Sequence, residues 1–349
     1  MSWLRTDSIA GVSAEIFDAL RAANDGLAMP YGDDNWSARL DTRFSALLGR
    51  SARVFPVTSG TAANALALAA VAGPYDLIAG HVDAHAFASE CGATEMMSGG
   101  ARFLHVPGEQ GRIDPALLDA ALMQAARNAA KAHRPAVLTV TQLTERGSVY
   151  PLDRLSALGE IARRHRLHVH MDGARFANAV VALGVSPAEM VAALGVDVLA
   201  FGATKNGTMG ADAVVILNPD LGEQMARQRK RAGQDLSKAR FLAAQLLAYL
   251  DADLWLRNAR HANAMARRLA DAARGVQGIN VTNEVDGNIV FAAMTPEVVR
   301  ALERADLAPR PHRTSGDVCT TFRLVTSFAT TADEIERFEK AVGRLGHSH

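Results

Sequence analysis

The chain has little of what marks secreted, membrane-spanning or nucleic-acid-binding proteins. It contains 2 cysteines in 349 residues, which disfavours a disulfide framework and is typical of a reducing compartment. Neither Cys91 nor Cys319 has the Cys-x-x-Cys partner of a zinc site, and no metal is expected. Lysine plus arginine number 37, as do aspartate plus glutamate, so there is no basic surplus to hold nucleic acid.

Apolar runs in the chain are short. None is long enough to cross a bilayer, and the longest, residues 62–72, is interrupted by Asn64, which favours a buried helix. The N-terminal residues 1–7 have no apolar core of the kind found in signal peptides. We therefore expect a cytoplasmic protein without a membrane partner, whose two thiols are buried and inert.

Two apolar runs, residues 167–171 and 198–203, each lead to one functional group. Runs of this length predict buried strands; Asp172 follows the first and Lys205 the second. The spacing of 205 − 172 = 33 residues is enough for a helical crossover between neighbouring strands. Because ligands of open α/β sheets bind beyond the carboxyl ends of the strands, we expect both groups in one crevice. Pyridoxal phosphate needs both, since its aldehyde forms a Schiff base with a lysine and its ring nitrogen pairs with an acid.

A turn with hydroxyl groups, Ser59-Gly60-Thr61, lies between an expected strand at 53–57 and the helix at 62–72. Free backbone N–H groups and the helix dipole make such a turn an anion site. The alternative is ordinary N-capping by Ser59 or Thr61. The acid and the amine described above favour a phosphate seat, because the cofactor carries a phosphate.

Two further residues stand out by position. His85 is expected at the start of a helix, in a loop of the kind that carries function, or as a polar residue that faces water. Glu90, five residues later, is expected off the face that carries His85. Arg323 interrupts an apolar alternation, so it either meets an anionic substrate group in a cleft or extends along an edge strand to solvent.

Regular alternation of strands and helices predicts an α/β fold with a mostly parallel sheet covered on both faces. The turn between strands 198–203 and 211–217 is too short for a crossover, so this pair is expected as an antiparallel hairpin. We expect an N-terminal arm and interface segment at 1–50, a large domain at 51–250 and a small α+β domain at 251–349. The other expected strands are 77–80, 102–106, 136–142, 279–282, 288–294 and 322–328, and the other expected helices are 13–23, 115–133, 151–165, 222–232, 237–273, 296–305 and 332–343.

Four motifs together resemble those of the low-specificity L-threonine aldolases. They are His-Met-Asp-Gly-Ala-Arg-Phe at 170–176, Gly-Ala-Thr-Lys-Asn-Gly at 202–207, Ser-Gly-Thr-Ala-Ala-Asn at 59–64 and Tyr-Gly-Asp-Asp at 31–34. The similarity runs from Thr6 to Arg323. This family belongs to the fold-type-I enzymes of pyridoxal 5'-phosphate, in the branch that also holds the β-eliminating lyases. The resemblance implies a seven-stranded, mostly parallel sheet between helices and a smaller C-terminal α+β domain.

The resemblance also implies roles for individual residues. Lys205 bears the cofactor, Asp172 holds its ring nitrogen, and His85 stacks on its ring and orders the catalytic water. The phosphate is held by Ser59, Gly60 and Thr61, with Thr204 and Lys230 as lesser candidates, and the substrate carboxylate by Arg175, Arg323 and Thr6. Family members are usually homotetramers built from tight dimers, in which Tyr31 and its neighbours contribute across the interface.

The implied reaction is cleavage of L-threonine or L-allo-threonine, and of other β-hydroxy-α-amino acids, into glycine and an aldehyde. Thr6 stands where many members have serine, and Glu145 stands where some have histidine. The general base is therefore open between Glu145, His85 and a bound water. Alternative functions are cleavage of phenylserine, β-elimination, or binding of the cofactor without catalysis.

Overall fold

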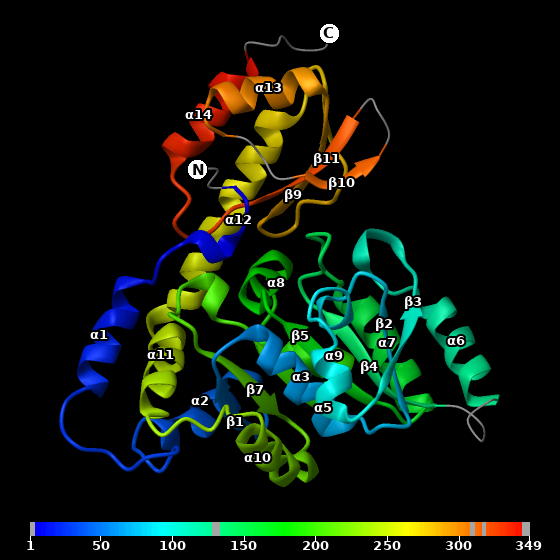
Figure 1. Ribbon diagram of the computed structural model, residues 1–349, viewed down its shortest axis with the longest axis vertical. Coiled ribbons are helices and arrows are strands. Elements are labelled where there is room, and N and C mark those ends of the chain that lie inside the picture. The colour runs from blue at the N-terminus through cyan, green and yellow to red at the C-terminus, as the bar shows by residue number, and fades with distance from the viewer. Residues whose placement is uncertain (1–3, 128–132, 308–310, 316–318, 344–349) are drawn as a thin grey trace.

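The computed structural model describes residues 4–127, 133–307, 311–315 and 319–343 (Figure 1). It contains a seven-stranded sheet and a four-stranded sheet. In Figure 1 the larger sheet with its helices fills the lower part of the molecule, and the smaller sheet lies above it.

The larger sheet is mostly parallel, as predicted. β7 runs antiparallel to both of its neighbours, β1 and β6, and the other neighbouring strands are parallel. The expected hairpin of β6 and β7 is therefore confirmed. In sheet order the strands are β1 (Arg53–Val57), β7 (Asp212–Ile216), β6 (Val198–Phe201), β5 (His168–Gly173), β4 (Arg134–Thr141), β2 (Asp76–His81) and β3 (Arg102–Val106).

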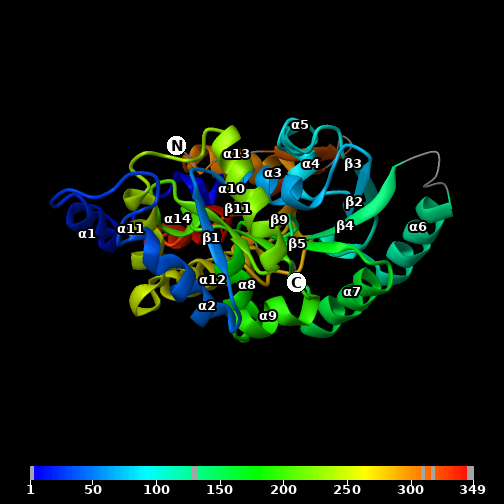
Figure 2. The ribbon, with the colours of Figure 1, turned by 90° about the horizontal axis from the view of Figure 1, so that it is seen from below.

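Helices cover both faces of this sheet because its strands are apolar on both sides. In β6, Val198 and Ala200 belong to one buried cluster, and Leu199 and Phe201 belong to the other. Figure 2 shows the two layers of helices on either side of the strands. One layer holds α3 (Gly60–Val71), α5 (Ala93–Ser98) and α10 (Gly222–Arg231), and the other α2 (Leu40–Leu48), α7 (Leu152–Arg164) and α9 (Pro187–Leu194). The sheet is also flanked by α4 (His85–Ala88), α6 (Pro115–Arg127) and α8 (Phe176–Leu183).

The smaller sheet is antiparallel and packs against three helices in a core of its own. The N-terminal arm begins there, because Leu4 is buried in this core and its carbonyl accepts a hydrogen bond from Val325 N at 2.8 Å. The division at residues 50 and 250 stays a prediction. The strands are β8 (Ile279–Val281), β9 (Ile289–Met294), β10 (Pro311–Ser315) and β11 (Cys319–Val325), and the helices are α12 (Leu254–Ala273), α13 (Pro296–Arg304) and α14 (Ala332–Gly343).

The arm then runs from the small sheet down to the large one. It continues through a 3-10 turn, η1 (Asp7–Ile9), into α1 (Ala14–Ala23), which packs against α11 (Arg240–Leu250). Asp7 lies between the two sheets, because its carboxylate accepts hydrogen bonds from Asn288, next to β9, and from Arg175, just after β5.

Several sequence predictions about local structure were wrong. The single helix expected at 237–273 is broken into α11 and α12, because Ala252 and Asp253 have positive φ angles of 46° and 53° that a helix cannot contain. Cys91, expected to be buried, is exposed in a turn with φ of 52°. β10 was not predicted. Part of the helix expected at 115–133 lies outside the described residues.

Within the described ranges no single helix is long and apolar enough to cross a membrane. The pair α8 and α9 reaches that length and composition only when the two are taken together across a bend of 99°. The same part of the chain contains no cluster of three or more His, Cys, Asp or Glu that would hold a metal ion.

Candidate active site

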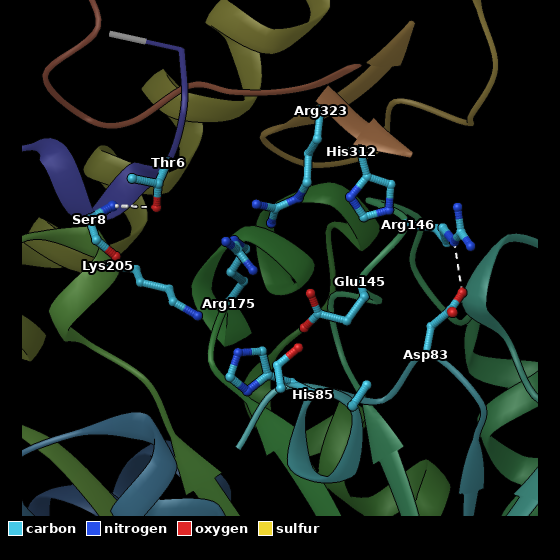
Figure 3. Close-up of a pocket in the computed structure, with 12 residues that line it drawn as sticks. Thr6, Ser8, Asp83, His85, Glu145, Arg146, Arg175, Lys205, His312 and Arg323 are labelled. Carbon is cyan, nitrogen blue, oxygen red and sulfur yellow. Dashed lines mark hydrogen bonds and ion pairs between the residues drawn. The ribbon is translucent and has the colours of Figure 1, made fainter. Parts of the chain in front are cut away.

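One pocket brings together six of the residues singled out in the sequence (Figure 3). They come from four parts of the fold: the N-terminal arm, the strand-end loops of the large sheet, the start of α4 and strand β11 of the small sheet. The six are Thr6, His85, Glu145, Arg175, Lys205 and Arg323. Ser8, Asp83, Arg146 and His312 also line this pocket and were not predicted.

Lys205 is carried by a short 3-10 turn, η4 (Thr204–Asn206), in the loop between β6 and β7. Asp212, the first residue of β7, fixes this loop because its Oδ1 accepts hydrogen bonds from Ala203 N at 2.7 Å and Thr204 N at 2.9 Å. Asp212 is buried, and burial raises the pKa of its carboxyl while these two N–H groups lower it. The Lys205 amine extends from this loop into the pocket (Figure 3).

The loops after β5 and β6 pass very close to each other at Gly202. A side chain there would place its Cβ only 2.6 Å from the Ala174 backbone, which no real contact allows. Glycine at this position thus allows the chain segments that follow β5 and β6 to lie close together. This contact brings the loops of Asp172 and Lys205 next to each other.

Asp172 lies at the end of β5 with 1% of its surface exposed. Its Oδ1 accepts a hydrogen bond from Ala174 N at 2.9 Å and its Oδ2 accepts one from Asn64 Nδ2 at 3.0 Å. It makes no ion pair with any residue that the structure describes. A buried carboxylate without a cation is costly, so this site favours a cationic partner that the protein itself does not supply.

His85 begins α4, as expected, and faces the pocket with 33% of its side chain exposed. Its Nδ1 lies 2.7 Å from Glu90 Oε1. The expectation that Glu90 lies off the face of His85 was wrong, because α4 ends at Ala88 and the following turn brings Glu90 back beneath the imidazole. The hydrogen bond to Glu90 raises the pKa of His85, burial lowers it, and the charges of Glu145 and Asp172 raise it further.

Arg175 and Arg323 both line the pocket, but only Arg175 has a partner in the described chain. Asp7 binds Arg175 in a buried pair. No hydrogen bond or ion pair of Arg323 is found among the described residues. Burial lowers the pKa of Arg323 and the positive charge of Arg175 lowers it further. The positive charges of the two guanidinium groups repel each other, and that of Arg323 has no partner among the described residues. This side of the pocket is therefore suited to bind an anion.

The hydroxyl-containing turn caps α3, since Ser59 Oγ accepts a hydrogen bond from Ala62 N at 3.2 Å. Ser59 is therefore the N-cap of α3, as the alternative predicted. This cap does not use the backbone N–H groups of Gly60 and Thr61, which could still bind an anion. A methyl group on Gly60 would lie 4.0 Å from Asp212 Oδ2, which puts the turn close to the loop that carries Lys205.

Tyr31 and Lys230 do not line this pocket. They lie together on the surface, where Lys230 Nζ is 4.4 Å from the Tyr31 ring centroid and 3.0 Å from Asp235 Oδ2. Both side chains are largely exposed, at 50% for Tyr31 and 65% for Lys230. The role of Tyr31 in binding substrate across an interface and the role of Lys230 in binding the cofactor stay predictions.

Sequence reasoning missed the residues that support the site from behind. Asp7, Asn64, Glu90, Asp212 and Asn288 are buried and polar. Asn64 carried a signal, because it is the one polar residue in the apolar run at 62–72. Asp212 carried a similar one at the start of an apolar strand.

Comparison with known proteins agrees with this geometry. A model of the beta-eliminating lyase family matches residues 4–295. The low-specificity L-threonine aldolase of Pseudomonas aeruginosa is 42% identical over 298 residues, which cover 85% of each chain. That of a Pseudomonas species (strain NCIMB 10558) is 38% identical over 297 residues, again 85% of each chain.

The fold predicted from the resemblance is also confirmed. The solved structure of Leishmania major threonine aldolase superposes with a TM-score of 0.91 and 25% identity, over 98% of each chain. The family match spans most of the sequence, and the aldolase of Pseudomonas aeruginosa is 42% identical over 85% of this chain. The chain therefore belongs to the beta-eliminating lyase family and, within it, to the low-specificity L-threonine aldolases.

Proposed function

We propose that this protein cleaves L-threonine or L-allo-threonine, and other β-hydroxy-α-amino acids, into glycine and an aldehyde with pyridoxal 5'-phosphate as cofactor. Family membership supports a lyase of this kind. The observation that carries the proposal is the pocket itself, in which the Lys205 amine faces Arg175 and Arg323. An amine for the cofactor and guanidinium groups for a carboxylate are what a reaction on a free amino acid requires.

The residues present fit the cofactor. Asp172 is a buried carboxylate without an ion pair in the described chain, which suits a protonated ring nitrogen. His170, in the same strand, has its pKa lowered by burial to about 4 and so stays neutral beside it. The residues that would hold the cofactor are Lys205, Asp172, His85, Ser59, Gly60, Thr61, Thr204 and Arg175, with Lys230 as a further candidate. When bound, the cofactor supplies an electron sink for charge left on the substrate's α-carbon.

Arg323 and Arg175 would bind the substrate carboxylate, and Thr6 would add a hydrogen bond. The Thr6 hydroxyl accepts from Ser8 N at 3.2 Å and keeps its own proton to donate. Holding the carboxylate fixes rotation about the bonds of the α-carbon. This decides which bond at that carbon is aligned to break, and the proposed reaction requires the Cα–Cβ bond.

The proton on the β-hydroxyl must leave as the Cα–Cβ bond breaks. His85 and Glu145 line the pocket and are the two side chains that would accept it, directly or through a water. Assistance of this kind contributes about 10²–10⁴-fold to such reactions.

The competing functions give different products. Incubation of the purified protein with L-threonine is expected to release glycine and acetaldehyde in equal amounts. Release of ammonia and a 2-oxo acid would instead identify β-elimination. A marked preference for phenylserine, with release of benzaldehyde, would favour a phenylserine aldolase. If the protein binds the cofactor but forms no product from any of these substrates, it would be a cofactor-binding protein without catalytic activity.

We propose further that the protein works in the cytoplasm as a homo-oligomer, a dimer of dimers. Large apolar side chains of the N-terminal arm are exposed in the single chain, at 106% for Leu27, 65% for Met29 and 50% for Tyr31. A contiguous exposed apolar segment of this kind favours a partner surface. Light scattering of the purified protein would give the number of subunits, and a monomer would refute this part of the proposal.

A further inference from the structure

An ion pair closes the side of the pocket that lies opposite Lys205. Arg146 Nε lies 2.7 Å from Asp83 Oδ2, and both side chains line the pocket (Figure 3). In the proposed function the substrate's amino group lies at Lys205 and its carboxylate at Arg175 and Arg323. The four groups on the α-carbon point in different directions, so the β-substituent is directed away from these residues and toward the ion pair.

A second cavity lies directly behind this ion pair. Asp83 and Arg146 line both the pocket, of about 510 Å³, and the second cavity, of about 530 Å³. Cavities of this size are within the range that holds small molecules. The walls of the second cavity are mainly polar and include Gln110, Asn283 and Thr321. The ion pair is therefore a partition between two spaces of similar size.

Arg146 is held in place by the small sheet and the loop that leads into it. Its guanidinium carbon lies 5.7 Å from the centroid of the Phe291 ring, and its carbonyl accepts a hydrogen bond from Asn283 Nδ2 at 2.9 Å. Gly147 follows with a φ of 83°, and a side chain there would place its Cβ 2.8 Å from Ile289 O. The loop that carries Arg146 therefore packs closely against the small sheet.

Asp83 is held from the large sheet. Its backbone N–H donates a hydrogen bond to His81 Nδ1 at 3.0 Å. The proton of the neutral His81 ring is therefore on Nε2, which lies 3.1 Å from the Gly108 carbonyl oxygen and donates to it. His81 is buried, and burial lowers its pKa, which favours the neutral ring. Both halves of the ion pair are thus anchored in the fold.

We propose that the Asp83–Arg146 ion pair is the specificity-determining wall of the substrate site. It admits a short β-substituent, such as the methyl group of threonine, and excludes long unbranched ones, because the guanidinium blocks the path into the second cavity. This rests on the proposed function. Replacement of Arg146 by a small residue joins the two cavities, and a long β-substituent then extends into the second one, past the carboxylate of Asp83.

Amino acids that lack a β-hydroxyl test this without turnover, since they cannot release an aldehyde. L-2-Aminobutyrate has the same methyl β-substituent as threonine, and L-norleucine has a longer one. In calorimetric titrations of the holoenzyme, we expect the wild type to bind L-norleucine at least about tenfold more weakly, because one misfitting methylene group discriminates about 10- to 200-fold. Arg146→Ala should remove most of this difference, whereas Arg146→Met, which keeps the length without the charge, should retain it. A wild type that binds both ligands equally, or an Arg146→Ala variant with an unchanged ratio, would overturn the proposal.

L-Arginine locates the long substituent. In the wild type its guanidinium would meet that of Arg146, so we expect weak binding. In Arg146→Ala the ligand's guanidinium takes the place of the lost one beside Asp83, and its affinity relative to L-2-aminobutyrate should rise about tenfold or more. Addition of Asp83→Asn should abolish most of this gain. A gain that persists in the double variant would show that the substituent lies elsewhere, which contradicts the proposal.

Arg134→Ala is the matched control. Arg134 Nε lies 2.8 Å from Asp76 Oδ1, which is a contact of the same kind at the N-terminal ends of β4 and β2, away from the pocket. This variant should leave the ratio of L-norleucine to L-2-aminobutyrate binding unchanged. If the wild type releases no glycine from L-threonine, the proposed function fails, while the binding ratios still test the wall.

Discussion

The Asp7 carboxylate and the Arg175 guanidinium form a buried bidentate pair, with Nε–Oδ2 at 2.7 Å and Nη2–Oδ1 at 3.1 Å. Asn288 Nδ2 from the small sheet also donates to Asp7 Oδ2, at 3.0 Å. One carboxylate of the N-terminal arm thus joins the two sheets. Asp7 uses two of the three guanidinium nitrogens and leaves Nη1 for a substrate carboxylate.

Asp7→Asn should weaken substrate binding although Asp7 does not line the pocket. The amide cannot hold both guanidinium nitrogens, so Arg175 loses its fixed orientation. We expect KM for L-threonine to rise about tenfold, which corresponds to about 1.4 kcal/mol, with a smaller change in kcat. Steady-state kinetics checks this, and an unchanged KM would show that Arg175 needs no support from Asp7.

The same pair should make stability depend on pH in acid. Burial alone would raise the pKa of Asp7, but the charges of Arg175 and Lys205 and two hydrogen bonds lower it to about 2, against 3.8 for an ordinary aspartate. The folded-state pKa is depressed, so the stabilisation is present above pH 4 and is lost as pH falls from about 4 to about 2, amounting to about 2 kcal/mol. Urea unfolding of the wild type and Asp7→Asn at pH 6 and at pH 3 should therefore show a gap in stability that narrows in acid. A gap that widens would contradict this.

Arg323→Ala should raise KM more than it lowers kcat, because the substrate carboxylate loses the guanidinium group that we expect to bind it. A hydrogen bond to a charged group contributes about 1.5–3 kcal/mol, or about 10- to 150-fold in KM. Arg323→Lys should recover only part of this, since an ammonium lacks the planar fork. Arg268→Ala is a suitable control because Arg268 pairs with Glu336 and Glu339 on the surface. Equal KM values for all three variants would show that Arg323 does not bind the substrate.

Lys205→Ala should abolish turnover and the absorbance band of the lysine-attached cofactor together, because the variant has no amine at this position to attach it. Absorbance spectra and the glycine assay on the same sample check both. The exposed residue Lys340 offers a control in Lys340→Ala, which should retain both signals. A Lys205→Ala enzyme that still turned over would refute the assignment of this lysine.

The parts of the site that were predictable lie at the ends of apolar strands. Asp172 and Lys205 could be found because a strand that ends in one functional group is a local pattern, and the hairpin of β6 and β7 followed from a short turn. Asp7 could not be paired with Arg175, because the two are 168 residues apart and nothing local in the sequence couples them. Glu90 was misplaced because helical spacing would put it off the face of His85, whereas α4 ends at Ala88.

Predictions also failed where the backbone departs from regular structure. The break at Ala252 lies in a sequence whose composition favours helix, and only the packing of α11 and α12 in different directions requires it. Tyr31 and Lys230 are a different case, because they lie outside the pocket of the single chain and their roles stay predictions.

The groups of this site are divided unequally between two supports. Lys205, Asp172, Glu145 and His85 are carried by the larger sheet and its loops, and the Lys205 loop is tied back onto its own strand by Asp212. Arg323 stands on β11 of the other sheet. Any tilt between the sheets would therefore lengthen or shorten the distance from the Lys205 ammonium to the Arg323 guanidinium. Because the amino and carboxylate groups of an α-amino acid share one carbon, a substrate bound to both residues would hold the two sheets at one separation, whatever its side chain.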